Sequence, residues 1–149
     1  MSEMPESLDF LLAQICKLHY ARMHTLLEEL GLYRGQPPML FALWEREGAT
    51  HGELAARLHV KPATITKMIT RMERAGFVER RSDPEDQRVS RVYLTDAGRS
   101  IREQVEQVWR MLEEETFEGF GAEERDLLQR FLLQMCENLT RVAGGRPHF

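Results

Sequence analysis

The sequence predicts a mainly α-helical fold with one small β-hairpin. Apolar residues recur every three or four positions along several long segments of the 149 residues, which is typical of amphipathic helices. Residues 77–94 instead hold two short β-like runs, FVERR and VSRVYL, joined by the polar stretch SDPEDQ. With 42% hydrophobic and 30% charged residues, the chain has the composition of a soluble globular protein.

The N-terminal part of the chain is expected to form two helices. Residues 7–30 carry apolar side chains at helical spacing, and Gly31 can end this helix. Pro37 and Pro38 suit the first turn of the second helix, because the N–H groups that proline lacks would be unpaired there in any case. This helix should run to about Gly48.

The centre of the chain predicts two short helices followed by the hairpin. Thr50 and Glu53 have the spacing of a capping box at the start of the first helix, and Pro62 opens the second. Asp83-Pro84 is the turn signal between the two strands. After the hairpin, the sequence predicts a long helix and a final amphipathic helix, separated by a glycine-containing break.

Charge is unevenly distributed along the chain. The net charge is −4, which disfavours a polyanion as the partner. Residues 50–99 nonetheless hold ten Lys/Arg and seven Asp/Glu, a balance of +3, whereas the rest of the chain holds ten and seventeen, a balance of −7. A basic centre between acidic arms suits a module that binds a polyanion, and chance unevenness is the alternative interpretation.

The order helix, turn, helix and two-stranded hairpin is typical of a winged helix-turn-helix. In that arrangement the second helix presents its outer face to the DNA major groove. Off the apolar stripe of residues 62–75 lie small, hydroxyl-bearing or basic side chains, namely Ala63, Thr64, Thr66, Lys67, Thr70, Arg71 and Arg74, whereas a merely solvated face would hold more Glu, Gln and Lys. We therefore predict a DNA-binding face made by Lys61, Ala63, Thr64, Thr66, Lys67, Thr70 and Arg71.

The hairpin, or wing, adds four candidate DNA-binding residues. Arg80 and Arg81 end its first strand, where they can meet phosphates. Arg88 is expected to enter the minor groove, where negative potential is focused when the groove is narrow. Asp86 lies two residues earlier, close enough to hold the Arg88 guanidinium in a bidentate pair and so to position it.

The segment GELAARLHVKPATITKMITRMERAGFVERRSDPEDQRVSRVYLTDAG resembles the multiple-antibiotic-resistance regulator (MarR) family of bacterial transcription factors. The resemblance rests on the ELAxxL helix, the run TITKMITRMERAGFVERR, the DPEDQR wing and the LTDAG start of the long helix. The flanking helices extend it over nearly the whole chain. Gln87 departs from the pattern, because a second arginine is common there in the family, so one phosphate contact is expected to be missing.

The resemblance implies a homodimer that binds a pseudo-palindromic operator in double-stranded DNA and regulates transcription, with repression released by a ligand as the expected mode. The outer helices have the apolar stripes that such a dimer needs. The expected parts are an N-terminal dimerisation helix in residues 1–35, a winged DNA-binding domain in 36–98, and C-terminal dimerisation helices in 99–149.

Relatives of this type often bind a small phenolic or carboxylate ligand between the dimer helices and the winged domain, so the resemblance implies a small aromatic or carboxylate effector. The candidate lining residues are Tyr20, Met23, His24, Met39, Trp44 and Met68, although side chains at such spacing more often belong to a core. Cys16 lies four residues before Tyr20, as in the peroxide-sensing branch of the family, which makes a redox-sensing regulator an alternative. A lone cysteine on an apolar helix is more often a small buried hydrophobe.

Other classes of function find less support. The sequence has no glycine-rich phosphate loop, nucleophile elbow or metal triad, so we expect no enzyme, no cofactor and no metal site. No apolar run approaches the roughly 18 residues of a membrane span, and the start MSEMPESLDF lacks a basic signal region, so we expect a cytoplasmic protein without a membrane partner. A non-regulatory architectural DNA binder and a winged domain used only for protein contacts stay open as alternatives.

Overall fold

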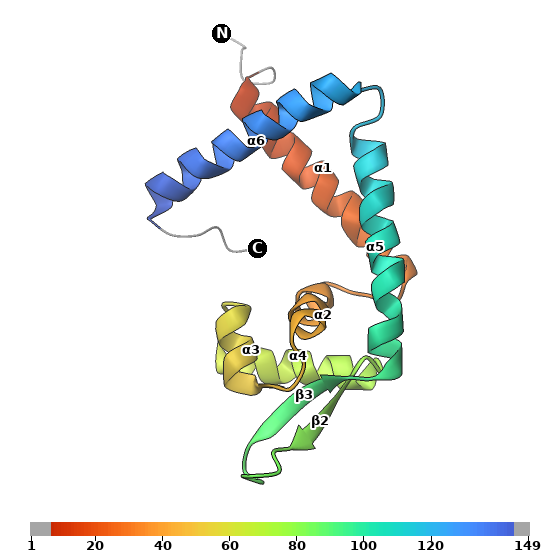
Figure 1. Cartoon of the computed structure of the whole chain (residues 1–149), viewed down its shortest axis with the longest axis vertical. Coiled ribbons are helices and arrows are strands. Elements are labelled where there is room, and N and C mark those ends of the chain that lie inside the picture. Colours follow the sequence, from red (N-terminus) through yellow and green to blue (C-terminus); the bar gives the residue numbers. More distant parts are fainter. Residues whose placement is uncertain (1–6, 145–149) are drawn as a thin grey trace. The chain divides into compact units, whose positions relative to one another are not determined.

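The computed structural model describes residues 7–144, which form six helices and three short strands (Figure 1). Residues 1–6 and 145–149, at the ends of the expected dimerisation parts, lie outside the described range. The chain forms two compact units, one ending at Leu112 and the other beginning at Glu113. In chain order the elements are α1 (Leu8–Glu29), α2 (Gln36–Glu45), β1 (Ala49–Thr50), α3 (His51–Arg57), α4 (Pro62–Arg74), β2 (Val78–Ser82), β3 (Ser90–Leu94), α5 (Asp96–Thr116) and α6 (Ala122–Ala143).

The helices begin at residues that deal with the unpaired N–H groups of the first turn, either by a capping side chain or, with proline, by having no N–H group. Ser7 caps α1, since its hydroxyl accepts a hydrogen bond from Phe10 N at 3.2 Å. The predicted capping box of α3 is confirmed: Thr50 Oγ1 accepts from Glu53 N at 3.1 Å, and Glu53 Oε2 accepts from Thr50 N at 3.0 Å. Proline occupies the first turn of both α2 and α4. The mainly α-helical class with a small hairpin is therefore confirmed.

The sheet has a strand that the sequence did not predict. Its order is β1-β3-β2 and both pairings are antiparallel, with Val78 opposite Leu94 in the hairpin. The added strand β1 pairs Ala49 with Val92 and Thr50 with Arg91. The hairpin is therefore attached to the rest of the unit, because the third strand β1 pairs with β3 and lies in the chain between α2 and α3.

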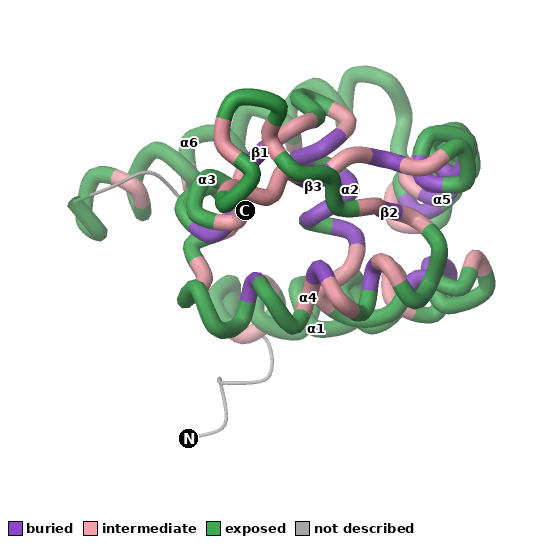
Figure 2. Tube along the Cα trace, turned by 90° about the horizontal axis from the view of Figure 1, so that it is seen from below, coloured by how far each residue is buried: buried purple, intermediate pink, exposed green. Residues whose placement is uncertain are grey.

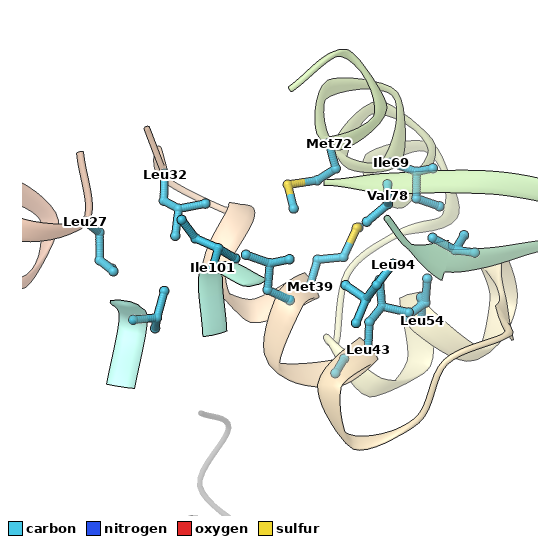
Figure 3. Close-up of a cluster of buried hydrophobic side chains, with 14 of the residues drawn as sticks. Leu27, Leu32, Met39, Leu43, Leu54, Ile69, Met72, Val78, Leu94 and Ile101 are labelled. Carbon is cyan, nitrogen blue, oxygen red and sulfur yellow. The ribbon is translucent and has the colours of Figure 1, made fainter. Parts of the chain in front are cut away.

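The core of the first unit is built around α2. Met39 and Leu43 are fully buried there, and Figure 3 shows them among side chains from the sheet, α3, α4 and α5. The buried stripe of α4 packs on the same cluster through Ile65, Ile69 and Met72. This packing fixes which face of α4 points outward.

The start of α5 lies directly against the end of α4 and the start of the wing. Gly98 has no room for a side chain, because a Cβ placed on it would lie 2.1 Å from the Phe77 carbonyl oxygen. That oxygen accepts a hydrogen bond from Thr95 N at 3.0 Å, and Trp44 Nε1 donates to the Gly98 oxygen at 2.8 Å. The glycine of the LTDAG motif thus joins α2, the wing and α5 at one point.

The second unit contains the last turn of α5 and the whole of α6. None of the 22 residues of α6 is buried. Its exposed large apolar side chains are Leu127, Phe131, Leu132, Leu133, Leu139 and Val142. Within residues 7–144, no helix is both long enough and apolar enough to cross a membrane.

Candidate nucleic-acid interface

The outer face of α4 is open to solvent, and it carries the predicted DNA-binding residues. Figure 2 shows buried positions recurring along α4, with exposed positions between them. Thr70 is the only half-buried member of the predicted set on this helix, and the others are exposed: Lys61, Ala63, Thr64, Thr66, Lys67 and Arg71. The structure therefore brings these seven residues together on and beside one helix.

Two threonine hydroxyls on this face have fixed directions. Thr66 Oγ1 donates to the Pro62 carbonyl at 3.2 Å, and Thr70 Oγ1 donates to the Thr66 carbonyl at 3.0 Å. Because each hydroxyl hydrogen is used inside the helix, the oxygen lone pairs are what these side chains offer to a ligand.

The basic side chains of α4 are available for a polyanion. Among the residues that the structure describes, no ion pair involves Lys61, Lys67 or Arg71. Lys61 is the N-cap residue of α4, so its cation stands beside the partial positive charge of the helix N-terminus. This end of α4 can hold a phosphate group.

Arg80 is held by an acid of α4. Its Nη2 lies 2.6 Å from Glu73 Oε1, and its Nε donates to the same oxygen at 2.9 Å. The hydrogen bond from Arg80 lowers the pKa of the Glu73 carboxyl below its usual value. Burial, followed by the charge of Arg80, lowers the pKa of the neighbouring His51 imidazole. A phosphate at Arg80 would therefore compete with Glu73 for this guanidinium.

Arg81 is also engaged within the wing. It forms an ion pair with Glu79, and its guanidinium lies 4.5 Å from the centre of the Tyr93 ring. Arg91 stands directly opposite Arg81 across β2 and β3, and like charges in this position repel. Each of the two arginines accordingly pairs with a different carboxylate.

Arg88 is the most exposed of the paired arginines, with 91% of its side chain accessible. Its Nε donates to Asp86 Oδ1 at 3.1 Å and its Nη2 donates to Asp86 Oδ2 at 3.4 Å. The Arg88 backbone N–H also donates to Asp86 Oδ1, at 3.0 Å. The two residues thus form the bidentate pair that their spacing suggests, at the end of the wing.

One part of the wing was not predicted from the sequence. Arg91 Nε donates to Asp83 Oδ2 at 2.6 Å, and Arg91 Nη1 donates to the Gly48 carbonyl at 2.9 Å. Asp83 and Arg91 are eight residues apart and Gly48 lies 43 residues before Arg91, so no local motif links the three. The signal that could have found them is the pairing of β2 with β3, which brings Arg91 beside Arg81 and so requires an acid nearby.

The predicted effector residues divide into two groups. Met39 is fully buried in the core, and Met23, Trp44 and Met68 pack partly buried against it. Tyr20 is exposed, and its ring lies 4.2 Å from the His24 ring and 5.6 Å from the Arg34 guanidinium carbon. Within residues 7–144, His24 Nε2 is buried and has no hydrogen-bond partner.

Cys16 is exposed one helical turn before Tyr20. No group of three or more His, Cys, Asp or Glu residues in the described part of the chain is arranged to hold a metal ion.

Comparison with known proteins decides the family. The MarR family model matches residues 32–90. The transcriptional regulator TtmR of Methylorubrum extorquens is 32% identical over 148 residues, an alignment that covers 95% of this chain and 73% of TtmR. The chain belongs to the MarR family. As a MarR-family protein it is a DNA-binding transcriptional regulator and not an enzyme.

Other MarR-family proteins give the same picture. The transcriptional repressor IacR of Pseudomonas putida is 29% identical, with 88% of this chain and 78% of IacR covered. The crystal structure of wild-type, ligand-free MarR from E. coli is 27% identical and matches with a TM-score of 0.73, covering 87% of this chain and 96% of that one. The match in structure extends beyond residues 32–90 to the flanking helices.

Proposed function

We propose that this MarR-family chain is a homodimeric repressor that binds a pseudo-palindromic operator and is released by a small ligand. The observation that carries the proposal is the exposed face of α4, on which unpaired cations and small side chains lie together within reach of a groove. In this proposal residues 36–98 bind DNA, and residues 1–35 and 99–149 form the dimer. Repression, and not activation, is proposed because the chain is similar to the repressor IacR.

The proposed contacts follow from the chemistry of each side chain. Lys67 and Arg71 reach a guanine edge or a phosphate, and Lys61 holds a phosphate at the N-terminus of α4. Ala63 and Thr64 permit close approach to the bases. Further contacts come from Thr66, Thr70, Arg80, Arg81 and Arg88, with Asp86 as the residue that orients Arg88.

The homodimer is proposed from the apolar side chains that the outer helices leave exposed. Four of them on α1 follow a spacing of three and four residues, which places them on one face: Leu8, Leu11, Ile15 and Leu18. In the second unit, α6 and the end of α5 line an open cleft of about 380 Å³. Exposed apolar stripes of this length normally mark an interface.

We expect Asp86→Ala to weaken DNA binding although it removes a negative charge. Without the carboxylate, the Arg88 guanidinium must be ordered as it binds, so we expect a Kd about 3- to 10-fold higher, the cost of immobilising one long side chain. The measurement is fluorescence anisotropy with an inverted repeat from the DNA upstream of the chain's own gene.

The matched control for Asp86→Ala is Glu85→Ala, which removes the same charge from the same loop. It should leave the affinity unchanged or raise it slightly. If both substitutions raise the affinity, charge counting explains the wing and the orienting role of Asp86 is wrong. Scrambling the inverted repeat separates a regulator from an architectural DNA binder, because only the regulator loses affinity.

The proposed effector site is the group formed by Tyr20, His24 and Arg34. An exposed aromatic ring beside a guanidinium suits a ligand that carries both a ring and a carboxylate. The His24 Nε2 atom has no hydrogen-bond partner in the described residues and could bind such a ligand. We expect benzoate or salicylate to raise the melting temperature, by mass action on the folded state, and to weaken operator binding.

Arg34→Ala should abolish both effects of the ligand, whereas Arg46→Ala, which also removes one exposed arginine, should abolish neither. Equal responses of the two variants would place the ligand elsewhere. Peroxide is the alternative signal: if peroxide lowers the DNA affinity and Cys16→Ser prevents this, the protein is a redox sensor of the kind that Cys16 suggests.

A further inference from the structure

In addition to the pairing of β1 with β3, one arginine side chain links the wing loop to the chain before β1. We use the term wing clamp for Asp83, Arg91 and the carbonyl group of Gly48. Arg91 Nε donates to Asp83 Oδ2 at 2.6 Å and Arg91 Nη1 donates to Gly48 O at 2.9 Å. A single guanidinium thus joins the start of the wing loop to the residue that precedes β1.

The wing clamp continues into the loop that carries Arg88. Asp83 N donates to the Val89 carbonyl at 2.8 Å, and Asp83 Oδ1 accepts from Glu85 N at 2.8 Å. Val89 N donates to the Asp86 carbonyl at 2.9 Å, which closes the loop at its far end. Asp83 therefore uses both of its carboxylate oxygens, one to shape the loop and one to attach it to Arg91.

Each partner in the clamp is held in place by its surroundings. The Asp83 side chain is 13% exposed and the Arg91 side chain is 32% exposed, in contrast to Arg88. Arg91 holds the pKa of the Asp83 carboxyl below its usual value, so this carboxylate keeps its charge. Gly48 has a φ of +77°, and the Tyr93 side chain lies 3.2–3.3 Å from the position of an added Cβ, so a side chain would be strained there. Gly48 N donates to the Val92 carbonyl at 2.9 Å, which holds this residue beside β3.

We propose that Arg91 is a positioning residue for DNA binding: through Asp83 and Gly48 it sets the direction in which the wing presents Arg88 to the minor groove. The inference rests on the proposed contact between Arg88 and DNA. Arg91 uses its Nε and Nη1 donors on Asp83 and Gly48, so its effect on DNA binding passes through Arg88. Without the clamp the wing loop would turn more freely, although β3 would stay paired with β1, and Arg88 would be ordered only on binding.

A double-mutant cycle tests the wing clamp in the full-length protein. The variants are Arg91→Ala, Arg88→Ala and the double variant, and the measurement is the Kd for the inverted-repeat DNA by fluorescence anisotropy. We expect Arg91→Ala to raise the Kd about 5- to 10-fold, and the double variant to bind hardly more weakly than Arg88→Ala alone, because coupled residues are not additive. The same cycle with Lys67→Ala should be additive, since Lys67 lies on α4.

Three further variants test the wing clamp if Arg91→Ala disturbs folding. Asp83→Asn keeps the shape of the side chain and removes the charge, so it should weaken binding, whereas Glu85→Gln removes a charge from the same loop and should not. Arg91→Lys can reach Asp83 or Gly48 but not both, and should give an intermediate Kd. Circular dichroism should show the same helix content for all variants.

The outcomes separate the inference from the proposed function. If Arg88→Ala leaves the Kd unchanged, the proposed minor-groove contact is wrong and the inference is overturned with it. If Arg88→Ala weakens binding but Arg91→Ala and Asp83→Asn do not, only the wing clamp is overturned. Additive effects of Arg91→Ala and Arg88→Ala would also overturn it, because they would show that Arg91 acts on its own.

Discussion

Gly98→Ala is expected to destabilise the protein, although alanine ordinarily favours a helix over glycine by about 1 kcal/mol. Gly98 lies in the first turn of α5, where an added Cβ would stand 2.1 Å from the Phe77 carbonyl oxygen and 3.1 Å from Leu94 Cδ2. The first of these atoms belongs to the backbone, so the start of α5 must move away from the wing. We expect a loss of about 1–3 kcal/mol in the free energy of unfolding, as for an overpacked core.

Urea unfolding at a fixed protein concentration measures this effect, and Gly52→Ala is its matched control. Gly52 lies in the first turn of α3, and nothing lies within 4 Å of its added Cβ. Gly52→Ala should therefore be neutral or stabilising, by a few tenths to about 1 kcal/mol. If Gly98→Ala is also stabilising, the close approach to Phe77 does not hold the junction together.

Lysines placed on the apolar stripe of α6 are expected to give a monomer that has lost specific DNA binding. Phe131 is 56% exposed and Leu139 is 66% exposed in the single chain, so the double variant Phe131→Lys/Leu139→Lys should not unfold the first unit. In the proposed dimer these side chains are buried, and two unpaired charges per subunit cannot be buried there. A monomer contacts one half-site only, so we expect the operator affinity to fall about 1000-fold or more, toward nonspecific binding.

Analytical ultracentrifugation reports the oligomeric state, and anisotropy reports the affinity. The control is Arg130→Lys/Glu137→Lys, which places the same two residues on the polar side of α6 and should stay dimeric. A Phe131→Lys/Leu139→Lys protein that remains a dimer would show that α6 does not carry the interface. A monomer that binds the inverted repeat as tightly as before would rule out operator recognition by two subunits together.

Local signals in the sequence were sufficient for most of the helices. Two of these signals act within a few residues: the capping box of Thr50 and Glu53, and the prolines at the start of α2 and α4. They can therefore be recognised without knowing the fold. The same holds for Asp86 and Arg88, which are two residues apart and meet wherever the loop goes. Their pairing could be predicted, as could the outward side chains of α4.

Features that depend on distant segments could not be predicted in this way. Strand β1 has two residues, too few for any periodicity, and it exists because β3 offers a partner. Two ion pairs join residues that meet only through packing or strand pairing. Glu73 and Arg80 are seven residues apart, and Asp83 and Arg91 are eight. Gly98 could be recognised as part of a motif, but the reason for it is a carbonyl group 21 residues earlier in the chain.

The ion pairs of the wing also affect how fast the protein finds DNA. Arg80, Arg81 and Arg88 each lie beside a carboxylate, and the field of such a pair decays with distance much more steeply than that of a lone cation. Salt further limits electrostatic attraction to about 8 Å at physiological ionic strength. Because the wing is nearly neutral at a distance, electrostatic steering of DNA must come from the unpaired cations of α4 and not from the wing. Substitution of the wing arginines should then change the association rate constant little and should act mainly on the lifetime of the complex.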